Sequence, residues 1–450
     1  MVASPASESF SGTDAAWLRM EKPDNLMTIT AVLCFDGKVD YGRLRAKIAD
    51  ELVEPFIRFR QRVIHRDGIL LRPRWELDPT FDLDRHIRVV RLSEPTDKAF
   101  RAFLDGLASI PLESDRPLWE ALLVENTPQG NALVARIHHS LADGFSLVYL
   151  TLSLVDEGCE IELPSGLRVE RPNLRESKAG QNRAHAAPKV PRKMPGALAA
   201  LKSVARAGEC LLHLLTLPRD SQTRLKGPLS GEKRVAWSKA VPLSTIKAIG
   251  TALGGTVNDI LLLAMAGAIR RYLSGRGDSL DGLEVRCTVP VNLRPLERRD
   301  ASLGNGFGLV FLELPVGIDD VHRRLAELRR RMDALKGSVE PVVSFATLAV
   351  AGMTPSVVQD ALTGVFSGKS TFVVTNVPGP TKRLQFAGKP IANLRFFVPQ
   401  SAGAGIGVSF FSYAGSVEAG ILADAVLLPD PMDLARAMDE EIAALARGVP

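Results

Sequence analysis

The residues Ala132 to Asp156, ALVARIHHSLADGFSLVYLTLSLVD, decide where the chemistry of this chain lies. They begin with a run of aliphatic and β-branched residues, which is typical of a strand. Upstream, WEALLVEN (119–126) has the same character, and TPQGN (127–131) between the two runs contains turn-forming residues. After Gly144 the apolar spacing changes to a helical period. The pattern therefore predicts a β-hairpin that ends in two histidines and leads into a helix.

Strand geometry makes the two histidines unequal, because successive side chains point to opposite faces of a sheet. His139 shares a face with Ile137, and His138 shares the other face with Arg136. Adjacent rings on a strand cannot easily chelate one metal, and no Cys or carboxylate stands nearby at ligand spacing, so we expect no metal site. Two interpretations remain open. Both histidines are structural, with Asp143 as a helix N-cap, or one imidazole is a general base for a hydroxyl or amine acceptor.

The segment from His138 to Gly144, HHSLADG, resembles the HHxxxDG signature of the CoA-dependent acyltransferase superfamily. That superfamily includes chloramphenicol acetyltransferase, plant BAHD acyltransferases and the condensation domains of nonribosomal peptide synthetases. Other stretches, in the same order along the chain, resemble bacterial wax ester synthase/diacylglycerol acyltransferases. They are TDAAW (13–17), FDLDRH (81–86), PLW (117–119), VNDILL (257–262), PVNLRP (290–295) with Gly304-Asn305, and TNVPGP (375–380). The resemblance covers nearly the whole chain except about residues 166–225, and Thr375 stands where that family more often has Ser.

The resemblance implies an α/β (α+β) fold of two chloramphenicol-acetyltransferase-like domains, each a mixed β-sheet flanked by helices, with a substrate tunnel between them. We expect an N-terminal domain over residues 1–165, a basic mobile linker and crossover helix over 166–230, and a C-terminal domain over 231–450. Leu394 to Phe397 is expected to complete the sheet of the second domain. The uncharged window 341–359 contains Gly352 and Pro355, and it predicts a buried helix that stops or kinks.

The resemblance also assigns roles around the signature. His139 would take the proton of the acceptor hydroxyl and return it to the departing sulfur. Asp143 would face away from the substrate and hold the loop by pairing with an arginine, for which Arg294 is the candidate by analogy. Gly144 would permit tight backbone at the junction, and His138 would orient the loop or line the site.

A second candidate site lies at the start of the helix predicted after Gly254-Gly255. Thr256 and Asp259 have the spacing of a capping box, which explains the aspartate structurally. Capping does not explain Asn258, which sits in the first helical turn, where amide groups can point at a developing negative charge. We therefore predict that Asn258 helps to hold the oxyanion or the acceptor.

The segment that links the predicted domains carries the positive charge of the chain. Residues 168–234 contain 15 Lys and Arg against 5 Asp and Glu, so the remainder is at −5 within a net charge of +5. Within it, residues 197–217 predict an amphipathic helix with a polar stripe of Lys202, Arg206, Glu209 and His213. Either this helix packs on its own protein, or it rests with the basic tract on an anionic bilayer or lipid droplet. No aromatic or motif context accompanies the basic residues, so we expect no nucleic-acid partner.

Composition is that of a folded protein. The chain has 450 residues, of which 46% are hydrophobic and 24% charged, and its four cysteines are scattered as in a reducing cytosol. The start lacks the basic and apolar regions of a secretory signal, and no window has the character of a membrane-spanning helix.

We therefore expect a lipid O-acyltransferase that moves a long-chain acyl group from acyl-CoA to a long-chain alcohol or diacylglycerol, giving wax ester or triacylglycerol. It would hold no permanent cofactor or metal. It would be cytoplasmic and peripherally associated with the inner membrane face or lipid droplets. Two alternatives stay open: a superfamily member with another acceptor, condensation-like or polyketide-associated, and a non-catalytic lipid-surface protein. The sequence leaves open the acceptor, the acyl length and the oligomeric state.

Overall fold

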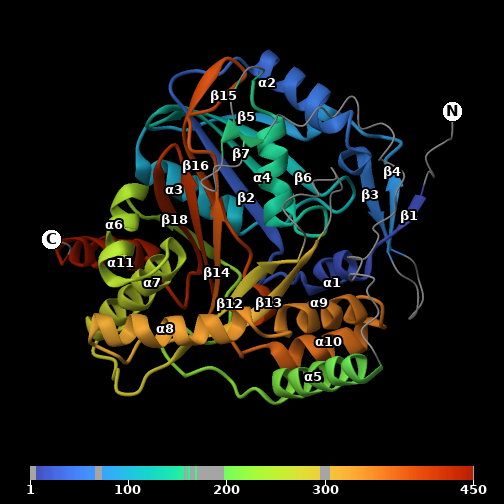
Figure 1. Ribbon diagram of the computed structural model, residues 1–450. Helices are drawn as coiled ribbons and strands as arrows, with labels where there is room; N and C mark the ends of the chain where they lie inside the picture. Colours follow the sequence, from blue (N-terminus) through green and yellow to red (C-terminus); the bar gives the residue numbers. More distant parts are fainter. Residues whose placement is uncertain are drawn as a thin grey trace.

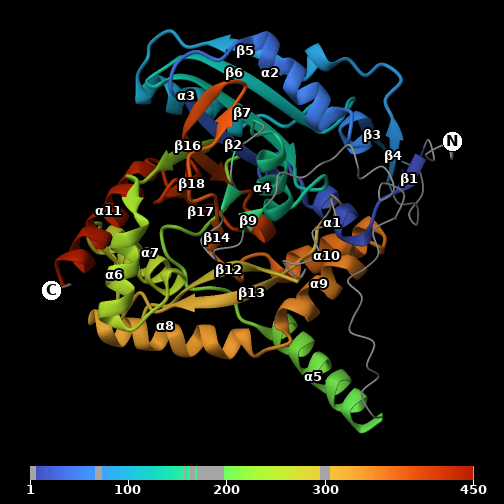
Figure 2. The same cartoon turned by 45° about the horizontal axis from the view of Figure 1, so that its top comes forward.

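The computed structural model of the chain describes residues 7–65, 73–156, 159, 161–162, 168–169, 197–293 and 305–448. Two mixed β-sheets form its centre, and helices pack against both (Figures 1 and 2). This is the two-domain mixed α/β architecture that the resemblance implied.

The first sheet has six strands in the order β15-β16-β2-β7-β6-β5. These strands are β15 (Gln385–Phe386), β16 (Lys389–Phe397), β2 (Thr28–Phe35), β7 (Gly130–His138), β6 (Trp119–Thr127) and β5 (Ile87–Arg91). Its helices are α1 (Gly12–Met20), α2 (Tyr41–Ile48), α3 (Asp97–Ala108) and α4 (Gly144–Ser153). Beside it lies a small sheet of β1 (Ser7–Ser9), β4 (Arg74–Leu77) and β3 (Gln61–Ile64).

The hairpin predicted around the two histidines is confirmed. Antiparallel β6 and β7 meet at a turn where Thr127 pairs with Gly130, and α4 begins at Gly144. Side chains of β7 alternate as expected. Leu133 and Ile137 pack into one hydrophobic cluster, while Val134 packs into another on the opposite face.

The second sheet has the order β10-β18-β17-β14-β12-β13, and a short β11 also pairs with β18. Its strands are β10 (Lys233–Trp237), β11 (Val241–Pro242), β12 (Val285–Asn292), β13 (Phe307–Leu314), β14 (Phe372–Pro378), β17 (Ile406–Tyr413) and β18 (Ser416–Asp424). Its helices are α6 (Leu243–Leu253), α7 (Val257–Ser274), α8 (Val321–Lys336), α9 (Glu340–Ala351), α10 (Ser356–Phe366) and α11 (Pro431–Arg447).

One prediction about this sheet is wrong. We expected Leu394 to Phe397 to complete it, but these residues belong to β16, which pairs antiparallel with β2 of the first sheet, Leu394 opposite Leu33. Every residue of β2 is buried, so this strand needs a neighbour on each edge, and β16 supplies the second one. An apolar run predicts a buried strand without saying which strand it pairs with. Because β16 comes from the second half of the chain and pairs with a strand of the first half, this pairing joins the two halves.

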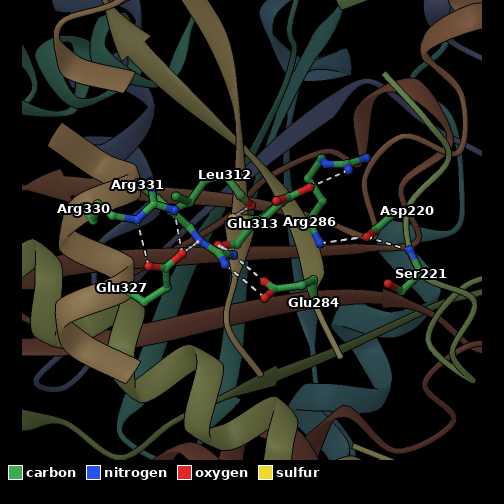
Figure 3. A network of polar contacts seen from close by, with 10 residues as sticks. Asp220, Ser221, Glu284, Arg286, Leu312, Glu313, Glu327, Arg330 and Arg331 are labelled. Atoms are coloured by element: carbon green, nitrogen blue, oxygen red, sulfur yellow. Dashed lines mark hydrogen bonds and ion pairs between the residues drawn. The ribbon is translucent and has the colours of Figure 1, made fainter. Parts of the chain in front are cut away.

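Most of the predicted mobile linker, residues 166–167 and 170–196, lies outside the described residues. The predicted crossover helix is present as α5 (Ala197–Thr216), and its end is anchored to the second sheet. Lys369 donates hydrogen bonds to the last carbonyls of the helix, those of Leu214 (2.6 Å) and Leu215 (2.9 Å). Asp220 then accepts the backbone N–H of Arg286 at 2.9 Å, and the Arg286 guanidinium donates to Glu313 at 2.7 Å (Figure 3). On the far side of β13, the Arg331 guanidinium of α8 donates hydrogen bonds to the carboxylates of Glu327 and Glu284 in the same network. The network is structural, because each of its charges is partnered within the protein.

The window 341–359 is partly as predicted. The helix breaks at residues 352–355 into α9 and α10, so the predicted stop is confirmed. The predicted burial is wrong, because Val342 and Val350 on α9 are exposed. No single helix in the described part of the chain is long and apolar enough to cross a membrane, although two bent pairs, α6 with α7 and α8 with α9, reach that length and composition together.

Candidate active site

His139 lies directly beyond the end of β7, where the two sheets approach each other. Its backbone N–H donates to the carbonyl of Met27 at 2.7 Å, which fixes the residue beside the start of β2. The imidazole is buried and stacks on the indole of Trp17 from α1, with centroids 3.9 Å apart and planes 12° apart. Phe307 of β13 stands on another side, 5.6 Å between centroids. The ring is therefore held by residues from both halves of the chain.

Asn305 decides which nitrogen of His139 carries the proton. Its Nδ2 donates to Asp14 Oδ1 and to the His139 carbonyl, both at 2.8 Å, so the orientation of the amide is set by two acceptors. Its Oδ1 then faces His139 Nδ1 at 2.9 Å and can only accept. The proton of the neutral imidazole therefore sits on Nδ1, and the Nε2 lone pair is left for a substrate.

Burial lowers the pKa of His139 to about 4. Desolvation of the imidazolium is the largest cause, the negative charge of Asp143 opposes it, and the other contributions are smaller. The ring is consequently neutral across the whole physiological pH range. A neutral imidazole with a free Nε2 has the form that a general base requires.

Asp143 holds the loop that follows the histidines. Its Oδ1 accepts the Ser146 N–H at 2.8 Å, which makes it the N-cap of α4. Its Oδ2 accepts the Gly306 N–H at 3.0 Å, next to Asn305. The carboxylate thus ties the loop to the start of β13. Gly144 is the first residue of α4, and Arg294, its predicted ion-pair partner, lies outside the described residues.

His138 points away from His139 and meets different groups. Its Nδ1 accepts the backbone N–H of Ser140 at 3.0 Å, and its Nε2 lies 3.0 Å from Glu21 Oε2. Burial alone would raise the Glu21 pKa, but the hydrogen bond and charge of His138, among the other causes, lower it overall. Of the two roles predicted for His138, this position favours orienting the loop, because both ring nitrogens are engaged behind it.

The open side of His139 is a chamber between the two sheets. It contains about 770 Å³ of space free of protein atoms, a volume that includes the solvent at its open side. Its walls come from both sheets and are mostly aliphatic and aromatic. The lining residues are Trp17, Ile29, His139, Pro290, Phe307, Leu309, Val373, Thr375, Val377, Phe396, Val398, Pro399, Ser401, Ser409, Phe410 and Phe411. Such walls suit a long apolar chain better than a charged molecule.

Two polar groups near the chamber differ in their position. Thr375 lines it, and its buried hydroxyl has no hydrogen-bond partner within the part of the chain that is described. Asn258 is not among the lining residues, and its Oδ1 accepts from Asn376 Nδ2 at 3.1 Å. Thr375 and Asn376 are neighbours on β14, so their side chains point to opposite faces. The predicted capping box of Thr256 and Asp259 is confirmed.

The structure therefore brings His139 and Asp143 together and leaves Asn258 apart from the chamber. Sequence reasoning did not assign roles to Asp14, Trp17, Glu21 and Asn305. Three of them lie in TDAAW and Gly304-Asn305, two of the motifs that carry the resemblance, and their place in those motifs was the available signal. Nothing in the sequence pointed to Glu21. Among the described residues, no cluster of three or more His, Cys, Asp or Glu side chains could hold a metal ion.

Two models of one protein family match most of the chain. Residues 10–261 match the model of the wax ester synthase/diacylglycerol acyltransferase catalytic domain, and residues 303–446 match the model of the WS/DGAT C-terminal domain. Two similar proteins of Mycobacterium tuberculosis (strain ATCC 25618 / H37Rv) are named "Probable diacyglycerol O-acyltransferase". The one called tgs1 is 28% identical and the alignment covers 96% of this chain and 94% of that protein. The one called tgs2 is 29% identical with 83% of each chain covered.

Solved structures share the fold. The wax ester synthase/diacylglycerol acyltransferase from Marinobacter aquaeolei VT8 superposes with a TM-score of 0.69 at 21% identity, over 98% of this chain and 99% of that one. The first condensation domain of the CDA synthetase superposes with a TM-score of 0.60 at 15% identity, over 99% and 96% of the two chains.

Proposed function

Since the chain belongs to the wax ester synthase/diacylglycerol acyltransferase family and is an O-acyltransferase, we propose that His139 catalyses direct transfer of a long-chain acyl group from acyl-CoA to a lipid hydroxyl. The acceptor is a long-chain alcohol, diacylglycerol or both, and the product is a wax ester or a triacylglycerol. The observation that carries the proposal is the Nε2 atom of a neutral, immobilised imidazole at the wall of an apolar chamber.

The reaction needs one proton carrier. The acceptor hydroxyl gives its proton to His139 Nε2, and its oxygen forms a bond to the thioester carbonyl carbon. The tetrahedral intermediate then collapses, the carbon–sulfur bond breaks, and the imidazolium returns the proton to the sulfur. The products are an ester and free CoA. Atoms and charges balance in this sequence without a resident cofactor or metal.

The Trp17 indole favours the charged form of His139, because an imidazolium stacked on the indole gains a cation–π attraction. This attraction acts when the proton arrives. Asn305 keeps Nδ1 as the donor throughout, which holds Nε2 toward the substrate.

Thr375 is our candidate for the donor to the oxyanion. Its hydroxyl is the kind of unpaired group that a tetrahedral oxygen requires, in a chamber that otherwise offers few polar atoms. Thr375→Val should lower kcat by about one to two decades, while Thr375→Ser should retain most of it. Equal activity in Val and Ser variants, measured by thiol release, would exclude this role.

The lipid nature of the acceptor also bears on location. Long-chain alcohols and diacylglycerol collect in membranes and droplets, so an enzyme that consumes them has to work at such a surface. We therefore propose a cytoplasmic protein in peripheral contact with the inner membrane face or with lipid droplets.

The test is thiol release from palmitoyl-CoA with a long-chain alcohol, with diacylglycerol and with no acceptor. We expect acceptor-dependent release, ester formation in equal amount, and loss of both in His139→Ala. Folded wild-type protein that releases no thiol with either lipid would overturn the proposal. The ratio of the two rates ranks wax ester against triacylglycerol synthesis.

A further inference from the structure

Helix α9 has an outer face without polar groups. Val342, Ala346 and Val350 are exposed at a spacing of four residues, which places them on one side of the helix, and Met353 continues the row beyond its end. Val342 is 56% exposed, Val350 52% and Met353 46%. The only charged residue within α9, Glu340, is buried and accepts the N–H of Phe311. Water therefore meets a row of bare aliphatic side chains.

Helix α10 adds further exposed apolar residues. It is joined to α9 through residues 352–355, and the two helices lie near α1 and α5 at one end of the molecule (Figure 1). Its exposed described residues are Val358, Ala361, Gly364 and Val365. We call these four residues, together with Val342, Ala346, Val350 and Met353, the α9–α10 surface. Exposed apolar groups that gather on neighbouring helices point to an interaction site.

The opposite side of α9 forms part of the support of the active site. Leu348 packs against the cluster of Trp17, Met27 and Phe307, two of which line the chamber. The backbones of α1 and α9 touch so closely that a Cβ at Gly352 would collide with the Gly12 carbonyl. Arg19 of α1 also donates to the Thr354 carbonyl at 2.7 Å. Helix α9 thus has exposed valines on one side, and on its other side it contacts residues that line the chamber beside His139.

We propose that the α9–α10 surface docks this enzyme on the surface of a lipid bilayer in which its acceptor is dissolved. The inference rests on the proposed function, since it takes the acceptor to be a water-insoluble lipid. It assigns the contact to named residues and places the lipid one helix away from the catalytic chamber.

The chemistry of the surface favours lipid over a protein partner. Protein interfaces are anchored by Trp, Tyr and Arg and contain roughly one hydrogen bond per 100–200 Å². Among the exposed residues described on α9 and α10, none is aromatic, charged or a hydrogen-bonding side chain. Contact with acyl chains, in contrast, gains affinity from buried apolar area and requires no hydrogen bonds from these side chains.

The absence of charge on this surface separates it from docking by α5 and the basic tract. Attraction of basic residues to anionic lipid weakens as salt rises, whereas burial of Val and Met does not. The α9–α10 surface therefore predicts binding to uncharged lipid that persists at high salt. Docking through the basic tract predicts binding that requires anionic lipid and weakens as salt rises.

The experiment is co-flotation of the full chain with phosphatidylcholine vesicles that contain diacylglycerol, at low and high salt. The test variant is Val342→Glu with Val350→Glu. The controls are Val89→Glu on β5 and Val426→Glu after β18, which change equally exposed valines (46% and 62%) elsewhere, and Leu212→Glu on α5 (63% exposed). We expect the double variant to bind at least about tenfold less, because a carboxylate resists transfer from water. The controls and high salt should leave binding unchanged.

Turnover separates this inference from the proposed function. With acceptor in vesicles, the double variant should lose activity in proportion to binding, but with a short alcohol dissolved in water it should match the wild type. Wild-type binding by the double variant would overturn the inference, as would binding that requires anionic lipid or vanishes at high salt. A wild-type dimer that the double variant converts to monomers would overturn it too, by assigning the surface to a second copy. Absence of thiol release by the wild type with the lipid acceptors as well as with the soluble alcohol would instead refute the proposed function.

Discussion

The two sides of the loop at residues 138–143 differ in every property that governs a histidine. In front, His139 meets indole, phenyl and aliphatic groups, and burial brings its pKa to about 4. Behind, His138 meets the backbone N–H of Ser140 and the carboxylate of Glu21. The residues are adjacent and of one type, yet one ring presents an unprotonated nitrogen to a chamber and the other has both nitrogens engaged. The position of each histidine relative to the sheet, and not its residue type, therefore decides which ring can act on a substrate and which ring supports the loop.

The largest expected effect tests this difference directly. His139→Gln should lower kcat by two to four decades, as expected when a general base is lost. His138→Gln removes a ring that orients the loop, and it should lower kcat less than tenfold. Both are read from thiol release per folded molecule, with folding checked by circular dichroism. Equal losses of kcat in the two variants would show that the two histidines do not differ in their roles.

Asn305 is the next test, because it connects the two halves of the chain at His139. Asn305→Ala should lower kcat by about a hundredfold and leave KM for acyl-CoA near its wild-type value, since a misplaced base affects the chemical step. Asn258→Ala is the matched control, because that amide bonds Asn376 away from the chamber. Initial rates over a range of acyl-CoA concentrations separate kcat from KM. A larger loss in Asn258→Ala than in Asn305→Ala would support the oxyanion role predicted for Asn258 and contradict the positioning role of Asn305.

Much of this arrangement was open to prediction from sequence. The hairpin, the helix that starts at Gly144 and the cap by Asp143 follow from local periodicity and turn chemistry, which depend on neighbours along the chain. The alternation of a strand was enough to separate His138 from His139. The resemblance then supplied the architecture and the reaction, since it covered nearly the whole chain.

What the sequence did not predict depends on contacts between distant segments. Asn305 lies 166 residues from His139, and it can fix the tautomer of that ring only after the fold brings the start of β13 against the end of β7. The pairing of β16 with β2 is missed for the same reason, because an apolar strand is compatible with any unpaired edge. Exposure of Val342 and Val350 was missed because an apolar helix is normally assigned to the core.

A third prediction concerns stability against pH. The unfolded state binds a proton at His139 near pH 6.5 and the folded state only near pH 4, so the folded state loses stability as pH falls through this interval. Relative to pH 7, the loss should reach about 2 kcal/mol at pH 5, at roughly 1.4 kcal/mol per pH unit. The contribution is complete above pH 6.5.

His139→Gln removes the titrating ring, so urea unfolding should show a shallower decline with falling pH in this variant. The buried His86, whose pKa is also lowered by burial, contributes equally to both proteins and cancels in the difference. Parallel curves for the two proteins between pH 7 and pH 5 would mean that the ring at position 139 is not desolvated in the folded state.

The smallest expected effect belongs to Asp143, which supports the loop without touching His139. Asp143→Ala should destabilise the protein by about 1 kcal/mol for the lost cap of α4, with a similar cost for the unpaired Gly306 N–H. Activity should fall together with folded protein, and Asp143→Glu should not restore either, because a longer side chain cannot reproduce both bonds. Asp143→Asn is the discriminating variant. Asn also caps helices, but its amide group would face the Gly306 N–H as a second donor, so it should recover the cap and not the tie to β13. A fully stable Asp143→Ala with a large defect in kcat would instead place the carboxylate in the reaction, on the front of the loop.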